Sequence, residues 1–151
     1  MTSDESAAQG RLPEEVRALL RERVESYEEL EILLALERLR GTGRTADELS
    51  TAVHVQVPLI ERALRSLEAH GLIERRIEPV AGDARKPEPR YRYAPAGPEL
   101  DRAVQALAKA YTEQPIPIIK LMSENAIQRM RTGAARAFAD AFILRKDKND
   151  S

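Results

Sequence analysis

The chain has 151 residues, of which 42% are hydrophobic and 32% charged, so it can form one soluble domain with a real core. It contains no cysteine and only 4% aromatic residues, which excludes disulfides and cysteine-ligated zinc and disfavours base-stacking platforms for single-stranded nucleic acid. The net charge is −1, and the sequence has neither an apolar run that could span a bilayer nor a signal peptide, so we expect a cytoplasmic protein without membrane contact.

The N-terminal part predicts a disordered segment and two helices. Residues 1–11 are small, polar and acidic and offer nothing to bury, which indicates disorder. Apolar residues at helical spacing then predict an amphipathic helix over 13–25. Ser26 and Glu29 form an S-x-x-E capping box that begins a second helix, and Gly41 ends it.

Two helices separated by a tight turn are predicted next. Thr45 and Glu48 form a second capping box, which begins a short helix over 46–52. A longer helix follows over 58–70, with a proline at its start, and Gly71 is suited to a left-handed C-terminal cap. The inner stripe of this longer helix consists of Ile60, Ala63, Leu64 and Leu67.

A two-stranded ribbon is predicted after the glycine. Alternation and the content of Ile and Tyr indicate strands over 72–78 and 90–93. The insert at 79–89 contains three prolines and a Gly-Asp pair, which predicts an exposed tip. On the second strand, Arg90 and Arg92 should share one face, and the two tyrosines should share the other.

The C-terminal part predicts further helices. One runs over 98–112 and is followed by two prolines and a short buried helix up to Ser123. A last helix is predicted over 124–146, with a possible bend near Gly133, and 147–151 form a solvated tail. Spacings of three and four along the last helix indicate a coiled-coil-like seam.

This order of elements resembles the winged helix-turn-helix transcriptional regulators of bacteria, of the MarR, PadR and ArsR-like kind. The similarity covers residues 27–96 and is carried by TADELSTAV, VPLIERALRSLEAHGLIERR and RYRYAPAG, with L-x-x-L-x-x-x-G-L-I as the closest match. It implies a mostly α (α+β) fold with a winged helix-turn-helix domain at 12–97. It also implies that flanking helices, here 13–25 and 98–146, build a two-fold dimer that places two recognition helices one DNA turn apart.

The predicted function is that of a transcriptional regulator that binds double-stranded DNA. The helix at 58–70 would read the major groove, where Gln can pair with adenine and Arg with guanine, and the wing at 79–89 would contact phosphates. Residues 51–96 hold 8 basic and 6 acidic groups, whereas residues 1–50 hold 7 and 12. The predicted DNA contacts are Thr45, Gln56, Pro58, Glu61, Arg62, Arg65, Arg85, Lys86 and Arg90. An ordinary solvated helix face with i,i+4 charge pairing is the alternative for the helix.

Homodimerisation is predicted from the apolar stripes of the C-terminal helices, because these helices exceed what a winged core needs to close its interior. The predicted dimer contacts are Leu100, Val104, Leu107, Tyr111, Ile127, Met130, Phe138 and Phe142. Two other interpretations stay open. One is a winged-helix adaptor that binds a transcription or sigma-type factor and not DNA. The other is a regulator with an effector pocket lined by Leu107, Tyr111, Ile118, Ile119, Met122 and Phe138.

No pattern in the sequence indicates catalysis, a metal or a cofactor. His54 and His70 stand apart from any cluster of carboxylates or further histidines, whereas a metal site needs three or four convergent ligands. The sequence has no glycine-rich phosphate loop and no nucleophile elbow. We therefore predict that the protein is not an enzyme.

Overall fold

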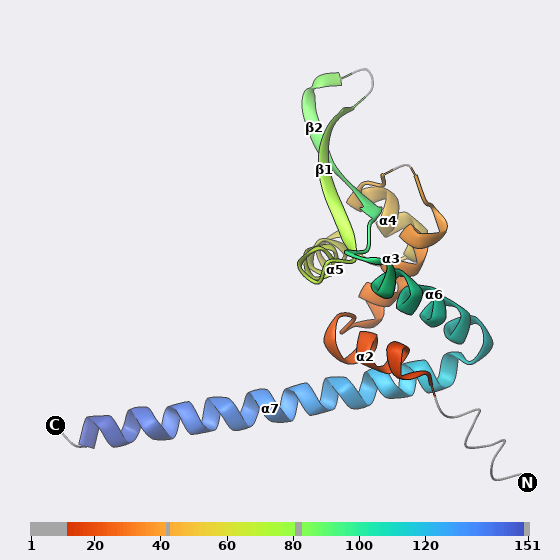
Figure 1. Cartoon of the computed structure of the whole chain (residues 1–151). Helices are drawn as coiled ribbons and strands as arrows, with labels where there is room; N and C mark the ends of the chain where they lie inside the picture. The colour runs from red at the N-terminus through yellow and green to blue at the C-terminus, as the bar shows by residue number, and fades with distance from the viewer. Residues whose placement is uncertain (1–11, 42, 81–82, 150–151) are drawn as a thin grey trace, which may run out of the picture.

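The computed structural model describes residues 12–41, 43–80 and 83–149, and it shows a helical body from which a hairpin and one long helix extend (Figure 1). The predicted disordered segment 1–11 lies outside the described residues. The mostly α fold with a small antiparallel sheet is the predicted one. The elements are α2 (Glu14–Glu22), α3 (Tyr27–Arg38), α4 (Ala46–Val53), α5 (Val57–Ala69), β1 (Ile73–Val80), β2 (Asp83–Tyr93), α6 (Pro98–Glu113) and α7 (Pro115–Asn149).

One hydrophobic core joins the winged motif to its flanking helices. α3 lies at its centre, since Leu30, Leu33 and Leu36 are fully buried. α5 contributes its predicted inner stripe, and α6 contributes Val104 and Leu107. The flanking helices and the winged motif therefore bury their apolar faces together, which fixes α5 relative to α2, α3 and α6.

The helix starts follow from local chemistry. The Oγ of Ser26 accepts a hydrogen bond from the amide of Glu29 at 3.1 Å, and the Oγ1 of Thr45 accepts one from the amide of Glu48 at 3.1 Å. Both predicted capping boxes thus cap α3 and α4 through their hydroxyls. The turn between α4 and α5 passes through His54, whose φ of 58° lies in the left-handed region. Glycine is the residue usually expected in this conformation, so the sequence pattern does not predict it for a histidine.

The hairpin is longer than predicted, because most of the proline-rich insert at 79–89 belongs to its strands. Tyr91 bonds Arg44 through both its amide and its carbonyl, each at 2.8 Å, so its backbone groups point away from β1. Pro87 and Pro89 lie four and two positions before Tyr91 on β2, so their backbone nitrogens also point away from β1. The missing N–H groups of the prolines therefore remove no hydrogen bond between the two strands. The prolines are compatible with the strand for this reason.

α7 is one continuous helix, whereas the sequence predicts a break after Ser123 and an end near residue 146. Pro115 and Pro117 lie in its first turn, where backbone amides have no partner within the helix. No residue near Ser123 breaks the helix, and Gly133 is tolerated within it (Figure 1). The prolines therefore begin α7 and do not separate two helices.

Gly71 is needed between α5 and β1, and its replacement tests the predicted cap. Its φ is +73°, and an added Cβ would lie 3.4 Å from the Cβ of Ala96. Because an L-residue is strained in this region, we expect Gly71→Ala to lower the free energy of unfolding by about 1–2 kcal/mol in urea titrations. Gly133→Ala serves as the control, since nothing lies within 4 Å of its added Cβ and the helix should gain up to about 1 kcal/mol. Equal stability of Gly71→Ala and the wild type would contradict the assignment.

Candidate nucleic-acid interface

α5 presents one face to the core and the other to solvent. Ile60, Leu64 and Leu67 are fully buried on the inner side. The opposite side, termed here the outer face of α5, carries side chains that are all exposed. These are Gln56, Pro58, Glu61, Arg62 and Arg65. Five of the predicted DNA contacts are therefore accessible together at one helix face.

Arg62 and Arg65 differ from the other basic residues of the motif. Arg75 lies 3.8 Å from Glu68, and Arg76 and Arg92 lie 3.0 and 3.4 Å from Glu74. Within residues 43–77 and 87–93, neither Arg62 nor Arg65 takes part in an ion pair. Although Glu61 and Arg65 have the i,i+4 spacing of a helical ion pair, they do not form one there. The guanidinium groups of Arg62 and Arg65 are therefore available to an external anion.

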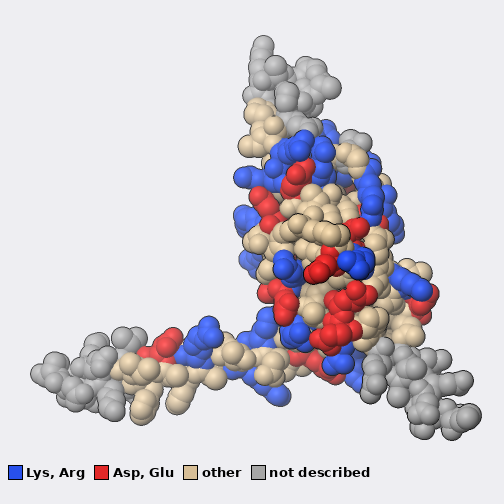
Figure 2. Space-filling model, viewed as in Figure 1, with Lys and Arg blue, Asp and Glu red and all other residues tan. Residues whose placement is uncertain are grey.

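Basic side chains gather around the base of the hairpin, and acidic side chains are denser toward α7 on the face seen in Figure 2. The predicted wing contacts Arg85 and Lys86 fall on β2, but their side chains lie outside the part of the chain that the structure describes. Their contact with phosphates stays a prediction. Within the described motif, Arg75 and Arg76 of the hairpin are also exposed but lie near glutamates, whereas Arg62 and Arg65 on α5 do not take part in an ion pair there.

Two of the predicted DNA contacts have roles within the protomer, and their contact with DNA stays a prediction. Thr45 is only 8% exposed, and its hydroxyl caps α4. Arg90 donates from Nη1 to the carbonyl oxygen of Gly43 at 3.0 Å and lies 3.8 Å from Glu48. An added Cβ on Gly43 would lie 2.9 Å from the Cβ of Arg90, so a larger residue would separate the two segments. Arg90 thus anchors the hairpin to the loop before α4.

Tyr93 fixes the other end of the hairpin to α6. Its hydroxyl donates to Oδ1 of Asp101 at 2.6 Å, and Arg40 lies over its ring at 5.3 Å from the centroid. Burial and the bond to Asp101 raise the pKa of Tyr93 above its ordinary value, and this bond from Tyr93 holds the pKa of Asp101 below its ordinary value. The tyrosine therefore stays a neutral donor, and the hairpin is held at its base by polar contacts from both strand faces.

The predicted dimer contacts divide into two groups. Val104 and Leu107 are fully buried in the core of the chain itself, and Leu100 and Tyr111 are half-buried against it. Tyr111 also donates to Oε1 of Glu31 at 2.9 Å. Val104 and Leu107 therefore belong to the core of the protomer, which corrects their assignment to an interface, whereas an interface role of Leu100 and Tyr111 stays a prediction.

The four predicted dimer contacts of α7 are exposed. Met130, Phe138 and Phe142 are 73%, 74% and 64% exposed, and Ile127 is 49% exposed. Arg129 donates to the carbonyl oxygen of Glu25 at 2.8 Å, and every side chain described from 130 to 143 is exposed or nearly so. This part of α7 extends beyond the body in Figure 1. An apolar stripe of this kind marks an interaction surface.

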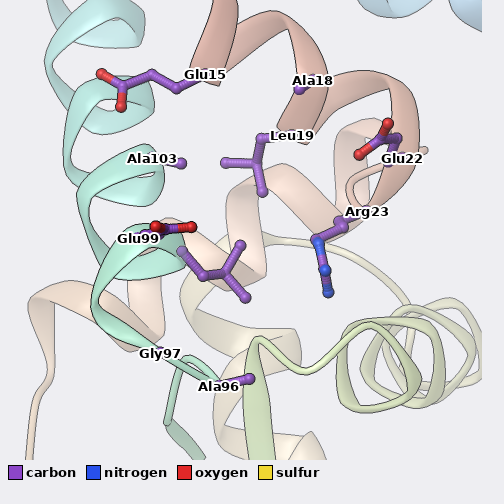
Figure 3. A pocket seen from close by; sticks show the side chains of 10 residues that line it. Glu15, Ala18, Leu19, Glu22, Arg23, Ala96, Gly97, Glu99 and Ala103 are labelled. Atoms are coloured by element: carbon purple, nitrogen blue, oxygen red, sulfur yellow. The ribbon is translucent and has the colours of Figure 1, made fainter.

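The residues of the predicted effector pocket do not all lie together within the described part of the chain, although Ile119 and Met122 line a groove beside Tyr27, and an effector site stays a prediction. Leu107, Ile118 and Met122 are buried in the core, whereas Phe138 lies on the exposed part of α7. A different, open groove of about 410 Å³ lies between α2 and α6. Figure 3 shows its apolar side chains among those of three glutamates and Arg23. The groove lining consists of Glu15, Ala18, Leu19, Glu22, Arg23, Ala96, Gly97, Glu99, Leu100 and Ala103.

Two further properties concern the described residues as a set. No group of three or more histidine and acidic side chains among them could hold a metal ion. None of the helices in this part of the chain combines the length and the apolar character needed to cross a membrane.

Comparisons with known proteins place this geometry in a family. The model of the HxlR-like helix-turn-helix family matches residues 28–117, which is more than half of the chain. No curated protein sequence matches the chain.

Several solved structures are similar to the chain. A mutant of S. aureus MepR bound to an oligodeoxyribonucleotide is 18% identical, with 93% of this chain and 98% of that chain covered and a TM-score of 0.47. S. aureus MepR bound to ethidium bromide is also 18% identical, with 93% of each chain covered and a TM-score of 0.47. A mutant of Lactococcus lactis ZitR is 13% identical, with 78% and 75% covered and a TM-score of 0.46. At these identities the similarity concerns the general fold.

Proposed function

Because the chain belongs to the HxlR-like helix-turn-helix family, it is a winged-helix transcription regulator, and we propose that it binds double-stranded DNA as a homodimer through α5. In this proposal the outer face of α5 enters the major groove, and the hairpin contacts the flanking phosphates. The two-fold symmetry of the dimer sets the spacing of the two half-sites.

The observation that carries the proposal is the pair of exposed arginines on α5. Arg62 and Arg65 have no ion pair within the described motif, although most other arginines there are paired with glutamates. A free guanidinium can bind the O6 and N7 of guanine or a phosphate oxygen. Gln56 and Glu61 share the exposed face and offer complementary groups for adenine and cytosine.

A titration of a fluorescent random-sequence duplex tests DNA binding. We expect the anisotropy to rise with protein concentration and the logarithm of the affinity to fall linearly with that of the salt concentration, by about 0.9 for each neutralised phosphate. Binding that is absent even at low salt would contradict the proposal.

A second candidate function is supported by the apolar stripe of α7. The exposed stripe and the acidic residues 1–50 would suit a protein partner, so the chain could act as an adaptor that does not contact DNA. The same titration separates the two functions, because the adaptor would leave the anisotropy unchanged at every salt concentration.

A further inference from the structure

The last turn of α5 is joined by side chains to helices that lie far away in the sequence. Ser66 donates from Oγ to Oε1 of Glu29, on α3, at 2.7 Å. Arg23, which follows α2, donates from Nη1 to the carbonyl oxygen of His70. These four residues, Arg23, Glu29, Ser66 and His70, are termed here the α5 clamp.

The polar groups of the clamp are matched donor to acceptor. Glu29 is only 5% exposed, so its carboxylate depends on a protein donor, and the hydroxyl of Ser66 supplies one. That hydroxyl has a single hydrogen, so its lone pair faces Nδ1 of His70, 3.4 Å away. The chain of groups therefore runs from His70 through Ser66 to Glu29. Loss of the Ser66 hydroxyl leaves the buried carboxylate of Glu29 without this partner.

The clamp stands next to the exposed arginines. Arg65 precedes Ser66 directly, and Arg62 lies one turn before it on α5. The apolar stripe holds α5 against the core, but apolar contacts are non-directional and allow small rotations. Directional hydrogen bonds from α2 and α3 to the last turn restrict such rotations. The orientation of Arg62 and Arg65 thus depends on side chains that do not face the solvent at that surface.

We propose that Arg23, Glu29 and Ser66 are positioning residues for DNA recognition, which set the angle at which α5 meets the major groove. This inference rests on the proposed function. Base-edge hydrogen bonds are short and directional, whereas attraction to phosphates acts over a longer range. A looser clamp consequently lowers affinity for the preferred sequence and leaves general DNA affinity unchanged.

The test begins with a duplex selected by the wild type from a random library, compared with a scrambled duplex of the same composition. In Ser66→Ala and Arg23→Met, we expect the ratio of selected to scrambled affinity to fall about tenfold, the effect of removing one base-edge interaction. Ser66→Thr, which keeps the hydroxyl, should restore the ratio. Ser123→Ala on α7 is the matched control, because Ser123 is exposed and far from the clamp in sequence, and it should keep the wild-type ratio.

Amide hydrogen exchange of the DNA-free protein provides a second measurement that does not depend on the proposed function. We expect faster exchange over the last turn of α5 in Ser66→Ala and Arg23→Met, with α4 unchanged. An equal loss of affinity for both duplexes would overturn the proposal, since it would mean lower stability alone. Unchanged exchange in folded variants would overturn it as well. If the wild type selects no duplex, the proposed function is contradicted. The hydrogen-exchange measurement then still tests whether the α5 clamp restricts the last turn of α5.

Discussion

Replacing Arg62 and Arg65 together with alanine is expected to lower the affinity for duplex DNA by about a hundredfold at fixed salt, because each arginine contributes roughly one tenfold step. Both side chains are exposed, and no ion pair within the described motif depends on them. The double variant should therefore keep the circular dichroism spectrum and melting temperature of the wild type. The weaker binding would reflect missing interactions with DNA and not a change in the fold.

The salt dependence tells which groups of the DNA the arginines bind. If they neutralise phosphates, the slope of log affinity against log salt should fall by about 0.9 for each phosphate that the variant no longer neutralises. If they pair with guanine, the weakening should be concentrated on the preferred sequence. Arg102→Ala on α6 is the matched control, since Arg102 is an exposed helical arginine outside the motif. Wild-type affinity of the double variant would show that α5 does not enter the groove.

The parts of the site that depend on neighbours in sequence could be predicted. The hydroxyls of Ser26 and Thr45 cap their helices because the accepted amide lies three residues ahead. The inner stripe of α5 is buried because helical spacing alone places its residues on one side. The same spacing identified the outer face of α5, including Arg62 and Arg65.

The parts that depend on distant partners could not be predicted. The hydrogen bond from Arg90 to the carbonyl oxygen of Gly43 was not predicted, because the two residues are 47 positions apart in the sequence. Glu29 was identified as a capping-box residue, and its carboxylate instead reaches Ser66, on α5. Most of the proline-rich insert is strand because its two halves pair with each other, with Pro79 opposite Pro87 and Glu78 opposite Glu88, which the local pattern did not indicate. Residues of α6 have the same apolar spacing whether they face a partner chain or their own core.

The last prediction concerns the exposed part of α7. A helix of 35 residues is roughly 50 Å long, and beyond Arg129 its described side chains are largely exposed within the protomer. Isolated helical segments are only marginally stable in water. We therefore expect another protein surface to cover the exposed apolar stripe that contains Met130, Phe138 and Phe142. A second copy of the chain supplies an identical stripe, which suits a two-fold interface.

We therefore expect Phe138→Asp combined with Phe142→Asp to convert a dimer into a monomer, measured by light scattering as a mass near 16.9 kDa instead of twice that value. The two rings contact no core, so the protomer should stay folded, but two buried negative charges would face their symmetry mates in the dimer. DNA affinity should fall in parallel, since two linked half-sites bind far more tightly than one.

Arg136→Asp changes the net charge by the same amount on the opposite side of α7 and should stay dimeric. A wild-type mass of one chain at high concentration would reject the homodimer and leave the stripe to a different protein partner.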